Sequence, residues 1–121
     1  MKIGIVGLGL MGGSLGRALA ARTEHTVFAL DTDREAMLKG ALLHAYHEEL
    51  TEENAKELDV LVLAVVPSAA ESILARFLPH LKSGATVTDL AGVKRPVVAL
   101  MKRLAPTRPC LLYTSDAADD K

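Results

Sequence analysis

The hydrophobic and polar positions of this chain divide it into short apolar runs and longer stripes with helical spacing, in regular alternation. The apolar runs predict strands within residues 3–6, 25–31, 59–67 and 83–92. Apolar residues that recur every three or four positions predict helices over about 10–22, 38–45, 70–81 and 93–104. Thr51, followed by two glutamates, predicts the start of a further short helix. Strands that alternate with helices favour a parallel sheet with right-handed crossovers, so the expected class is α/β.

Six glycines fall in the stretch GIVGLGLMGGSLG, positions 4–16, which joins the first predicted strand to the first predicted helix. The spacing Gly7-x-Gly9-x-x-Gly12 is the fingerprint of dinucleotide-binding Rossmann-type folds, and its place between strand and helix fits that reading. The first glycine would permit a tight turn, the second the approach of a pyrophosphate, and the third close packing of helix on strands. The predicted cofactor-binding residues of this loop are Gly7, Leu8, Gly9, Leu10, Met11 and Gly12. The alternative is a glycine-rich turn without a ligand, which would lose stability for no return.

An acidic residue, Asp31, ends the second predicted strand, about 20 residues beyond the last glycine of the fingerprint. A carboxylate there accepts hydrogen bonds from the adenosine ribose and repels a 2′-phosphate, so it favours NAD over NADP. The alternative role is to cap the following helix, which Asp33 could equally do. Arg34 leaves the choice between NAD and NADP open, because an arginine at this place could cover the adenine or bind a 2′-phosphate.

Ligands of open parallel sheets bind beyond the carboxyl ends of the strands, so the residues that follow the third and fourth predicted strands are candidates. Val65 and Pro67 would flank the ribose or nicotinamide of the cofactor. Asp89 would border its reactive end, with capping of the last helix as an alternative of equal weight. His44 and His47 have no third convergent ligand, so we interpret them as surface residues and predict no metal.

Composition narrows the function classes. The chain has 121 residues, half of them hydrophobic, and a formal net charge of −1, which argues against nucleic-acid and anionic-membrane partners. Its single cysteine favours a reducing compartment, and no apolar run is long enough for a membrane span or a signal peptide. We therefore expect a cytoplasmic protein. Residues 1–109 would form an NAD-binding Rossmann domain, and 110–121, which lacks periodicity, a non-native or disordered tail; a fifth strand at CLLY is the alternative.

Two segments of the chain resemble prephenate dehydrogenases and the related arogenate dehydrogenases. The first is KIGIVGLGLMGGSLGRAL, residues 2–19, and the second is LVLAVVPSAAESILARFLPHLKSGATVTDLAGVK, residues 61–94. The resemblance implies an NAD-dependent oxidoreductase of tyrosine biosynthesis, which oxidatively decarboxylates prephenate to 4-hydroxyphenylpyruvate. It also implies a homodimer, formed through a helical C-terminal domain that this sequence lacks. The expected fold is therefore a partial doubly wound sheet of about four strands.

Two departures limit what the resemblance implies for catalysis. Many family members carry a serine in an Asp-x-x-Ser-x-Lys loop; here Asp89 and Lys94 match, but Gly92 stands at the serine position. The family's catalytic histidine lies in a Gly-Gly-His-Pro segment, which is absent from this sequence. We therefore assign no catalytic residue and expect the chain alone to be inactive. The alternatives are a 3-hydroxyisobutyrate-type dehydrogenase, which GLGLMG also fits, and a non-enzymatic NAD-sensing module.

Overall fold

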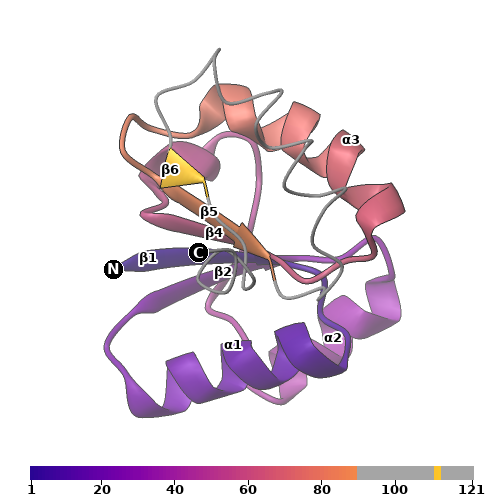
Figure 1. The fold of residues 1–121 in the computed structure, drawn as a ribbon. Coiled ribbons are helices and arrows are strands. Elements are labelled where there is room, and N and C mark those ends of the chain that lie inside the picture. Colours follow the sequence, from indigo (N-terminus) through magenta and orange to yellow (C-terminus); the bar gives the residue numbers. More distant parts are fainter. Residues whose placement is uncertain (90–110, 113–121) are drawn as a thin grey trace, which may run out of the picture.

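The computed structural model describes residues 1–89 and 111–112, and its elements follow the expected alternation of strands and helices (Figure 1). The strands are β1 Lys2–Val6, β2 Thr26–Leu30, β3 Glu48–Glu49, β4 Val60–Leu63, β5 Thr86–Asp89 and β6 Leu111–Leu112. The helices are α1 Leu10–Arg22, α2 Arg34–Leu42 and α3 Pro67–Phe77, with the 3-10 turns η1 Asn54–Glu57 and η2 Leu78–His80.

The strands pair in parallel in a single sheet of order β3-β2-β1-β4-β5-β6. β1 lies near the centre, where Ile3 stands opposite Val27 of β2 on one side and Val60 of β4 on the other. From β1 the chain first builds outward through β2 and β3, and then returns to start the other half at β4. This reversal between β1 and β4 is the switch point beyond whose carboxyl ends such sheets bind ligands.

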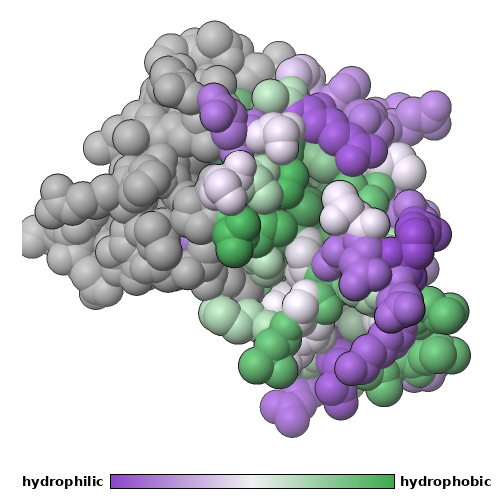
Figure 2. All heavy atoms as spheres, turned by 90° about the vertical axis from the view of Figure 1, so that its right-hand side faces the viewer, coloured by the Kyte–Doolittle hydropathy of each residue, from purple (hydrophilic) through white to green (hydrophobic). Residues whose placement is uncertain are grey.

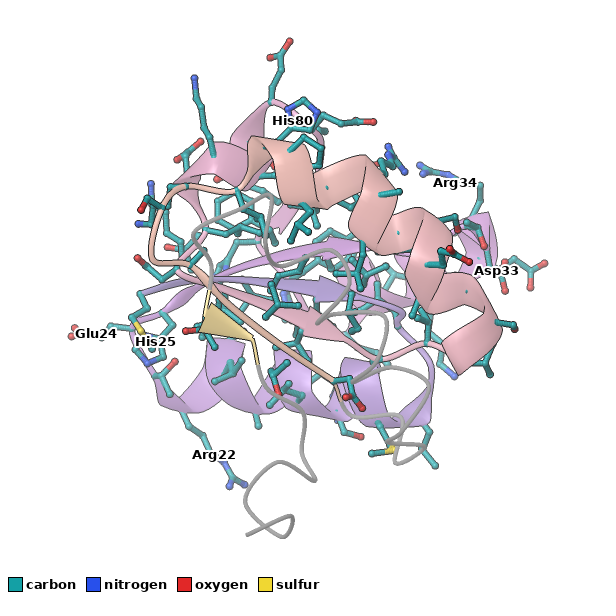
Figure 3. All side chains as sticks on the ribbon, turned by 45° about the horizontal axis from the view of Figure 1, so that its top comes forward. Arg22, Glu24, His25, Asp33, Arg34 and His80 are labelled. Carbon is teal, nitrogen blue, oxygen red and sulfur yellow. The ribbon has the colours of Figure 1, made fainter. Side chains whose placement is uncertain are left out.

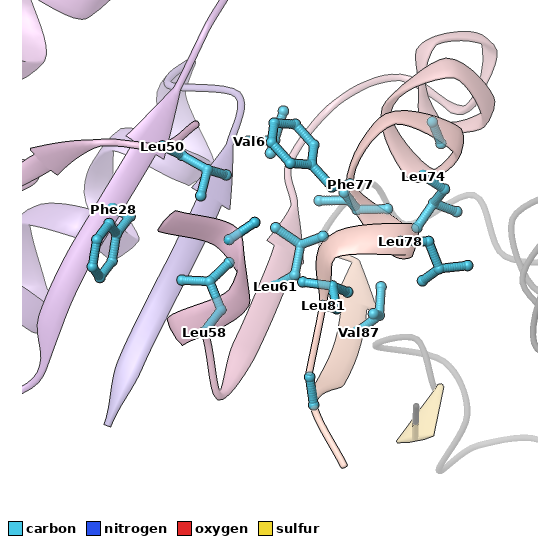
Figure 4. Packing of buried hydrophobic residues seen from close by; sticks show 14 residues of the cluster. Val6, Phe28, Leu50, Leu58, Leu61, Leu74, Phe77, Leu78, Leu81 and Val87 are labelled. Atoms are coloured by element: carbon cyan, nitrogen blue, oxygen red, sulfur yellow. The ribbon is translucent and has the colours of Figure 1, made fainter. Parts of the chain in front are cut away.

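Helices cover both faces of the sheet, α1 and α2 on one and α3 on the other (Figure 1). Alternate residues of β1 explain this layering, because Ile3 and Ile5 pack with Leu15 and Leu19 of α1. Val6 instead belongs to the larger cluster on the α3 face, which Figure 4 shows around Phe77 and Leu74. A sheet buried on both faces needs apolar residues in succession, which is what the apolar runs of β1, β2 and β4 supply.

The structure confirms the expected α/β parallel sheet and adds two strands to the four predicted from the apolar runs. β3 consists of two exposed glutamates and carries no apolar signal, so the sequence pattern gave no reason to expect it. β6, at Leu111–Leu112, pairs with Thr86 and Val87 of β5. That pairing corresponds to the alternative of a fifth strand at CLLY, while the domain boundary at residue 109 stays a prediction.

Three predicted boundaries shift for local reasons. The third strand ends at Leu63 rather than reaching Pro67, because Pro67 occupies the first turn of α3, where its missing N–H costs nothing. α2 begins at Arg34, since the Asp33 side chain accepts a hydrogen bond from the Glu35 N–H and caps the helix. Ala45, which the periodicity placed at the end of this helix, lies in the following loop and is buried. The predicted last helix, 93–104, lies outside the described residues.

Within the described part of the chain, no helix has both the length and the apolar character required to cross a membrane.

Candidate functional site

The predicted site residues that the structure describes gather at one edge of the sheet, where the parallel strands end. Val6 of β1 stands opposite Leu30 of β2 and Leu63 of β4, and Leu63 stands opposite Asp89 of β5. The glycine loop, Asp31 and the start of α3 follow directly on these ends. Figure 3 shows Asp33 and Arg34 at this carboxyl edge and Glu24 and His25 at the opposite one.

The three fingerprint glycines meet three different steric conditions. Gly7 has φ +103°, a conformation that L side chains rarely adopt, and a Cβ there would overlap the Ala64 carbonyl oxygen. A Cβ on Gly12 would overlap the Gly7 carbonyl oxygen, so α1 can approach the turn only with glycine at this position. A Cβ on Gly9 would have no atom within 4 Å. The protein itself therefore requires Gly7 and Gly12, whereas the space beside Gly9 is open to something else.

The start of α1 faces this open space without a capping side chain. Gly9 is the N-cap, no side chain accepts from the helix start, and the first turn contains no acidic residue. The first intrahelical bond runs from the Gly13 N–H to the Gly9 carbonyl oxygen at 2.8 Å. The amides before Gly13 have no intrahelical acceptor, and the helix dipole adds partial positive charge at their position. This arrangement suits an anionic group such as a pyrophosphate.

Asp31 binds the backbone on both sides of its own position. Its Oδ2 accepts a hydrogen bond from the Leu8 N–H at 2.7 Å, and its Oδ1 accepts one from the Asp33 N–H at 2.9 Å. The carboxylate is half-buried and retains further lone pairs, so ribose hydroxyls could still donate to it. The capping role weighed as its alternative falls to Asp33, as described above.

The Arg34 side chain pairs with a glutamate of β3. Its side chain is 74% exposed, and its closest charged partner is Glu49 of β3, with Nη1 and Oε2 3.5 Å apart. At that distance and exposure the ion pair holds the guanidinium weakly, which leaves it free to turn toward a ligand.

The carboxyl ends of β4 and β5 supply the second half of the edge. Val65 is half-buried against the main core cluster, and Pro67 forms the first residue of α3. Asp89 is only 1% exposed, at the end of β5. Gly92 and Lys94 lie outside the described residues. Leu10, Met11 and Val66 are exposed. Figure 2 shows that hydrophobic surface is present on the side of the molecule that it presents.

Leu8 was predicted only as a residue that contacts the cofactor, but the structure shows that it also packs in the protein interior. Leu8, the residue between the first two glycines, is 9% exposed and packs against Ala29 and Met37. A Cβ added at Gly40 of α2 would lie 3.1 Å from its Cδ1, so α2 is closely fitted around this side chain. A lone aliphatic residue flanked by glycines was the signal in the sequence that could have identified an anchor.

Two hollows lie along α1. One of about 460 Å³ separates the helix start from α2 and is lined in part by Leu8, Gly9 and Asp33. A larger one of about 730 Å³ lies beside the second half of α1 and includes none of the predicted site residues. The larger hollow therefore does not mark the candidate site, which is defined by the glycine loop and the strand ends.

The two histidines interpreted as surface residues are both exposed, in the loop after α2. The His47 Nδ1 accepts a hydrogen bond from the Val27 N–H at 2.9 Å, which occupies that nitrogen. Among the residues that the structure describes, no cluster of three or more acidic, histidine or cysteine side chains could hold a metal ion.

Comparison with known proteins gives a family match and a set of similar folds. The family model of the prephenate dehydrogenase nucleotide-binding domain matches residues 15–110. The matched span begins after the fingerprint glycines and includes Asp31 and Asp89, so it is largely independent of the glycine loop. No match was found among curated protein sequences.

Three solved structures illustrate the similarity. Synechocystis arogenate dehydrogenase is 30% identical with a TM-score of 0.72, over 83% of this chain and 37% of that one. Prephenate dehydrogenase from A. aeolicus, in complex with hydroxyphenyl propionate and NAD+, is 24% identical with a TM-score of 0.75, over 87% and 38%. The 3-hydroxyisobutyrate dehydrogenase of Mycobacterium tuberculosis is 20% identical with a TM-score of 0.81, over 93% and 39%. The chain thus spans about two fifths of the length of these structures.

Proposed function

The chain belongs to the prephenate dehydrogenase family, and we propose that it supplies the NAD site of an enzyme that oxidatively decarboxylates prephenate to 4-hydroxyphenylpyruvate. The observation that carries this proposal is the uncapped start of α1 beside the open space at Gly9, with the Asp31 carboxylate next to it. An anion site beside a ribose site would suit the two polar parts of a dinucleotide, its pyrophosphate and its adenosine ribose.

The residues of this chain would bind and orient the cofactor. The amides at the start of α1 hold the pyrophosphate, and Asp31 accepts from the adenosine ribose hydroxyls. Val65 and Pro67 flank the cofactor at the end of β4, while Asp89 borders its reactive end. NAD, when bound, supplies the hydride acceptor, which is the chemistry that the protein itself lacks.

In the proposed reaction a hydride leaves the ring carbon that bears the hydroxyl of the substrate. The bond to the ring carboxylate then breaks, carbon dioxide departs, and the electron pair left behind makes the ring aromatic. The group that handles the hydroxyl proton is the histidine that the family resemblance places in a Gly-Gly-His-Pro segment, which this sequence does not contain. This chain therefore contributes cofactor binding and little or no turnover. A cytoplasmic, homodimeric parent acting on prephenate or arogenate belongs to the same proposal.

Asp31 supports NAD over NADP. A 2′-phosphate placed at the ribose would lie against a carboxylate that already accepts two backbone N–H groups and carries a full negative charge. Isothermal titration calorimetry on the 121-residue chain should give a Kd for NAD at least about tenfold lower than for NADP. Equal or reversed affinities would show the assignment of Asp31 to be wrong.

The enzymatic part of the proposal needs a separate experiment. A chimera that joins residues 1–106 to the C-terminal region of a close relative should oxidise prephenate in the presence of NAD. Oxidation of 3-hydroxyisobutyrate instead would favour the alternative suggested by GLGLMG, for which the M. tuberculosis structure supports the fold alone. A folded chimera that binds NAD and prephenate without turnover would mean that Gly92 prevents catalysis or that the assigned reaction is wrong. It would also favour the alternative of a non-enzymatic NAD-sensing module.

A further inference from the structure

Leu8 of the glycine loop is held by both its backbone amide and its side chain, and these contacts point to a role beyond ligand contact. We propose that Asp31 and Leu8 form a clamp that fixes the shape of the glycine loop before any cofactor binds. Both act as positioning residues, in addition to the ribose contact of Asp31. The inference rests on the proposed NAD site, and it concerns how that site is prepared.

The polar half of the clamp is the Asp31 carboxylate. It receives the Leu8 N–H on Oδ2 and the Asp33 N–H on Oδ1, so one side chain ties the loop after β1 to the loop after β2. Hydrogen bonds to an ionised acceptor are roughly twice as strong as neutral ones, and this one is half-buried. The contact joins residues 23 positions apart in sequence, which makes it a tertiary lock rather than a local turn.

The apolar half is the Leu8 side chain. It is 9% exposed, whereas the next two residues with side chains, Leu10 and Met11, are 89% and 57% exposed. Ala29 of β2 and Met37 of α2 pack against it. Residue 8 is therefore held by its amide and by its side chain, while the glycines on either side have no side chain to hold them.

A loop with glycine on both sides of one residue loses more conformational entropy on ordering than other loops do. Fixing residue 8 in the free protein moves that cost from the binding step to folding, and preorganisation of this kind raises affinity. A consequence for specificity follows. Replacing Asp31 to admit a 2′-phosphate would release the loop as well, so it would weaken the binding of both dinucleotides instead of exchanging one for the other.

The test uses an NAD analogue whose adenosine ribose lacks both hydroxyls, so that a ribose contact cannot contribute. In Asp31→Asn the amide nitrogen must face one of the two backbone N–H donors, which breaks one bond of the clamp. We expect the Kd of the analogue to rise at least about tenfold in this variant. The matched control is Asp59→Asn, because Asp59 accepts the Lys2 N–H at 2.7 Å at the opposite edge of the sheet. Its Kd should stay within about twofold of wild type.

A second pair of variants addresses the apolar half. Leu8→Ala and Leu74→Ala each truncate a buried leucine and destabilise the fold, but Leu74 packs in the cluster on the α3 face. Only Leu8→Ala should raise the Kd of the analogue by about tenfold or more. Binding is measured well below the unfolding midpoint of each variant, so that a change in affinity is not a change in the folded fraction.

Amide hydrogen exchange in the ligand-free wild-type chain tests the clamp without any substitution. The Leu8 amide should exchange at least about tenfold more slowly than the Leu10 amide, which lies in the uncapped first turn. Equal exchange rates, or an Asp31→Asn variant that loses affinity for NAD but not for the analogue, would overturn the clamp and leave the NAD site standing. Failure of the wild-type chain to bind NAD at all would instead contradict the proposed function.

Discussion

The polar groups at the amino edge and at the carboxyl edge of this sheet find their hydrogen-bond partners in different ways. At the amino edge, side chains pair with one another: Lys2 with Glu57 and Lys82 with Asp59, each at 2.6 Å, and the terminal amino group meets the His25 Nδ1 at 2.8 Å. At the carboxyl edge, Asp31 binds backbone N–H groups, and the first turn of α1 has no capping side chain. The amino edge satisfies its polar groups internally, whereas the carboxyl edge keeps a set of backbone donors available for a ligand.

The paired charges at the amino edge also change the pKa values of the carboxyl groups there. The hydrogen bond from the Lys82 side chain lowers the pKa of Asp59 most, and the one from the Lys2 backbone N–H lowers it further. The hydrogen bond from the Lys2 side chain lowers the pKa of Glu57. These pairs are exposed, so they contribute little to the free energy of unfolding. These pairs satisfy polar side chains at the amino edge, whereas the proposed NAD site lies at the carboxyl edge, where the first amides of α1 have no capping side chain.

The largest effect should come from filling the space that α1 needs at the carboxyl edge. We expect Gly12→Ala to lower the free energy of unfolding by about 3 kcal/mol or more, because the new Cβ would overlap the Gly7 carbonyl oxygen. Urea denaturation measures the loss. The matched control is Gly13→Ala, whose Cβ would meet the Leu8 carbonyl oxygen at an ordinary 3.4 Å; it should stabilise the helix by up to about 1 kcal/mol. Similar losses in both variants would contradict this account of Gly12.

Filling the open space beside Gly9 should weaken NAD binding while it leaves the free energy of unfolding nearly unchanged. In Gly9→Ala the new methyl group meets no protein atom within 4 Å, so unfolding should change by less than about 1 kcal/mol. The same methyl group would stand where the pyrophosphate approaches, so the Kd for NAD should rise at least about tenfold. Calorimetric titration and thermal unfolding of the same sample measure the two effects. Unchanged NAD affinity would place the pyrophosphate elsewhere.

Removing a polar contact at the amino edge should lower the free energy of unfolding slightly and leave NAD binding unchanged. Asp59→Asn removes the negative charge that faces Lys82 and weakens the bond to the Lys2 N–H, which should cost at most about 1 kcal/mol of unfolding free energy because both contacts are solvent-exposed. The Kd for NAD should remain that of the wild type. A loss of NAD affinity here would mean that the two edges are coupled, and the contrast between them would fail.

The smallest effect is a dependence on acid pH. Hydrogen bonds from Arg76 lower the pKa of Glu52 from the ordinary 4.5 to about 2, and the pKa values of Glu57 and Asp59 are lowered as well. A carboxylate whose folded pKa is depressed stabilises the fold above its unfolded pKa and loses that contribution as pH falls through the folded value. Thermal midpoints should therefore decline as pH falls from 4.5 to about 2. Glu52→Gln should flatten part of that decline, and an unchanged slope would count against the pair.

The sequence predicted the parts of this site that depend on local pattern. The bounds of α1, the parallel pairing of the strands and the glycine turn all follow from spacing and from the steric demands of the turn. β3 escaped prediction because two exposed glutamates pair with β2 through their backbone alone. The bond from the Leu8 N–H to Asp31 escaped it for a related reason: a carboxylate at a strand end fits a ribose, a helix cap or a distant amide equally well. Only the fold brings Leu8 and Asp31 together.

The contact between Gly12 and the Gly7 carbonyl oxygen has a consequence for the length of the loop. Gly12 and Gly16 are both buried and lie on one side of α1, where a Cβ would overlap the Gly7 carbonyl oxygen and the Ala45 carbonyl oxygen, respectively. Each residue advances a helix by about 100°. A single insertion after Gly9 would turn Met11 and Leu15 into the places of these two glycines, and α1 would be lifted from the strands. The spacing of the fingerprint therefore sets which side of α1 faces the turn. An insertion or deletion rotates that side away, whereas a substitution leaves the rotation of the helix unchanged.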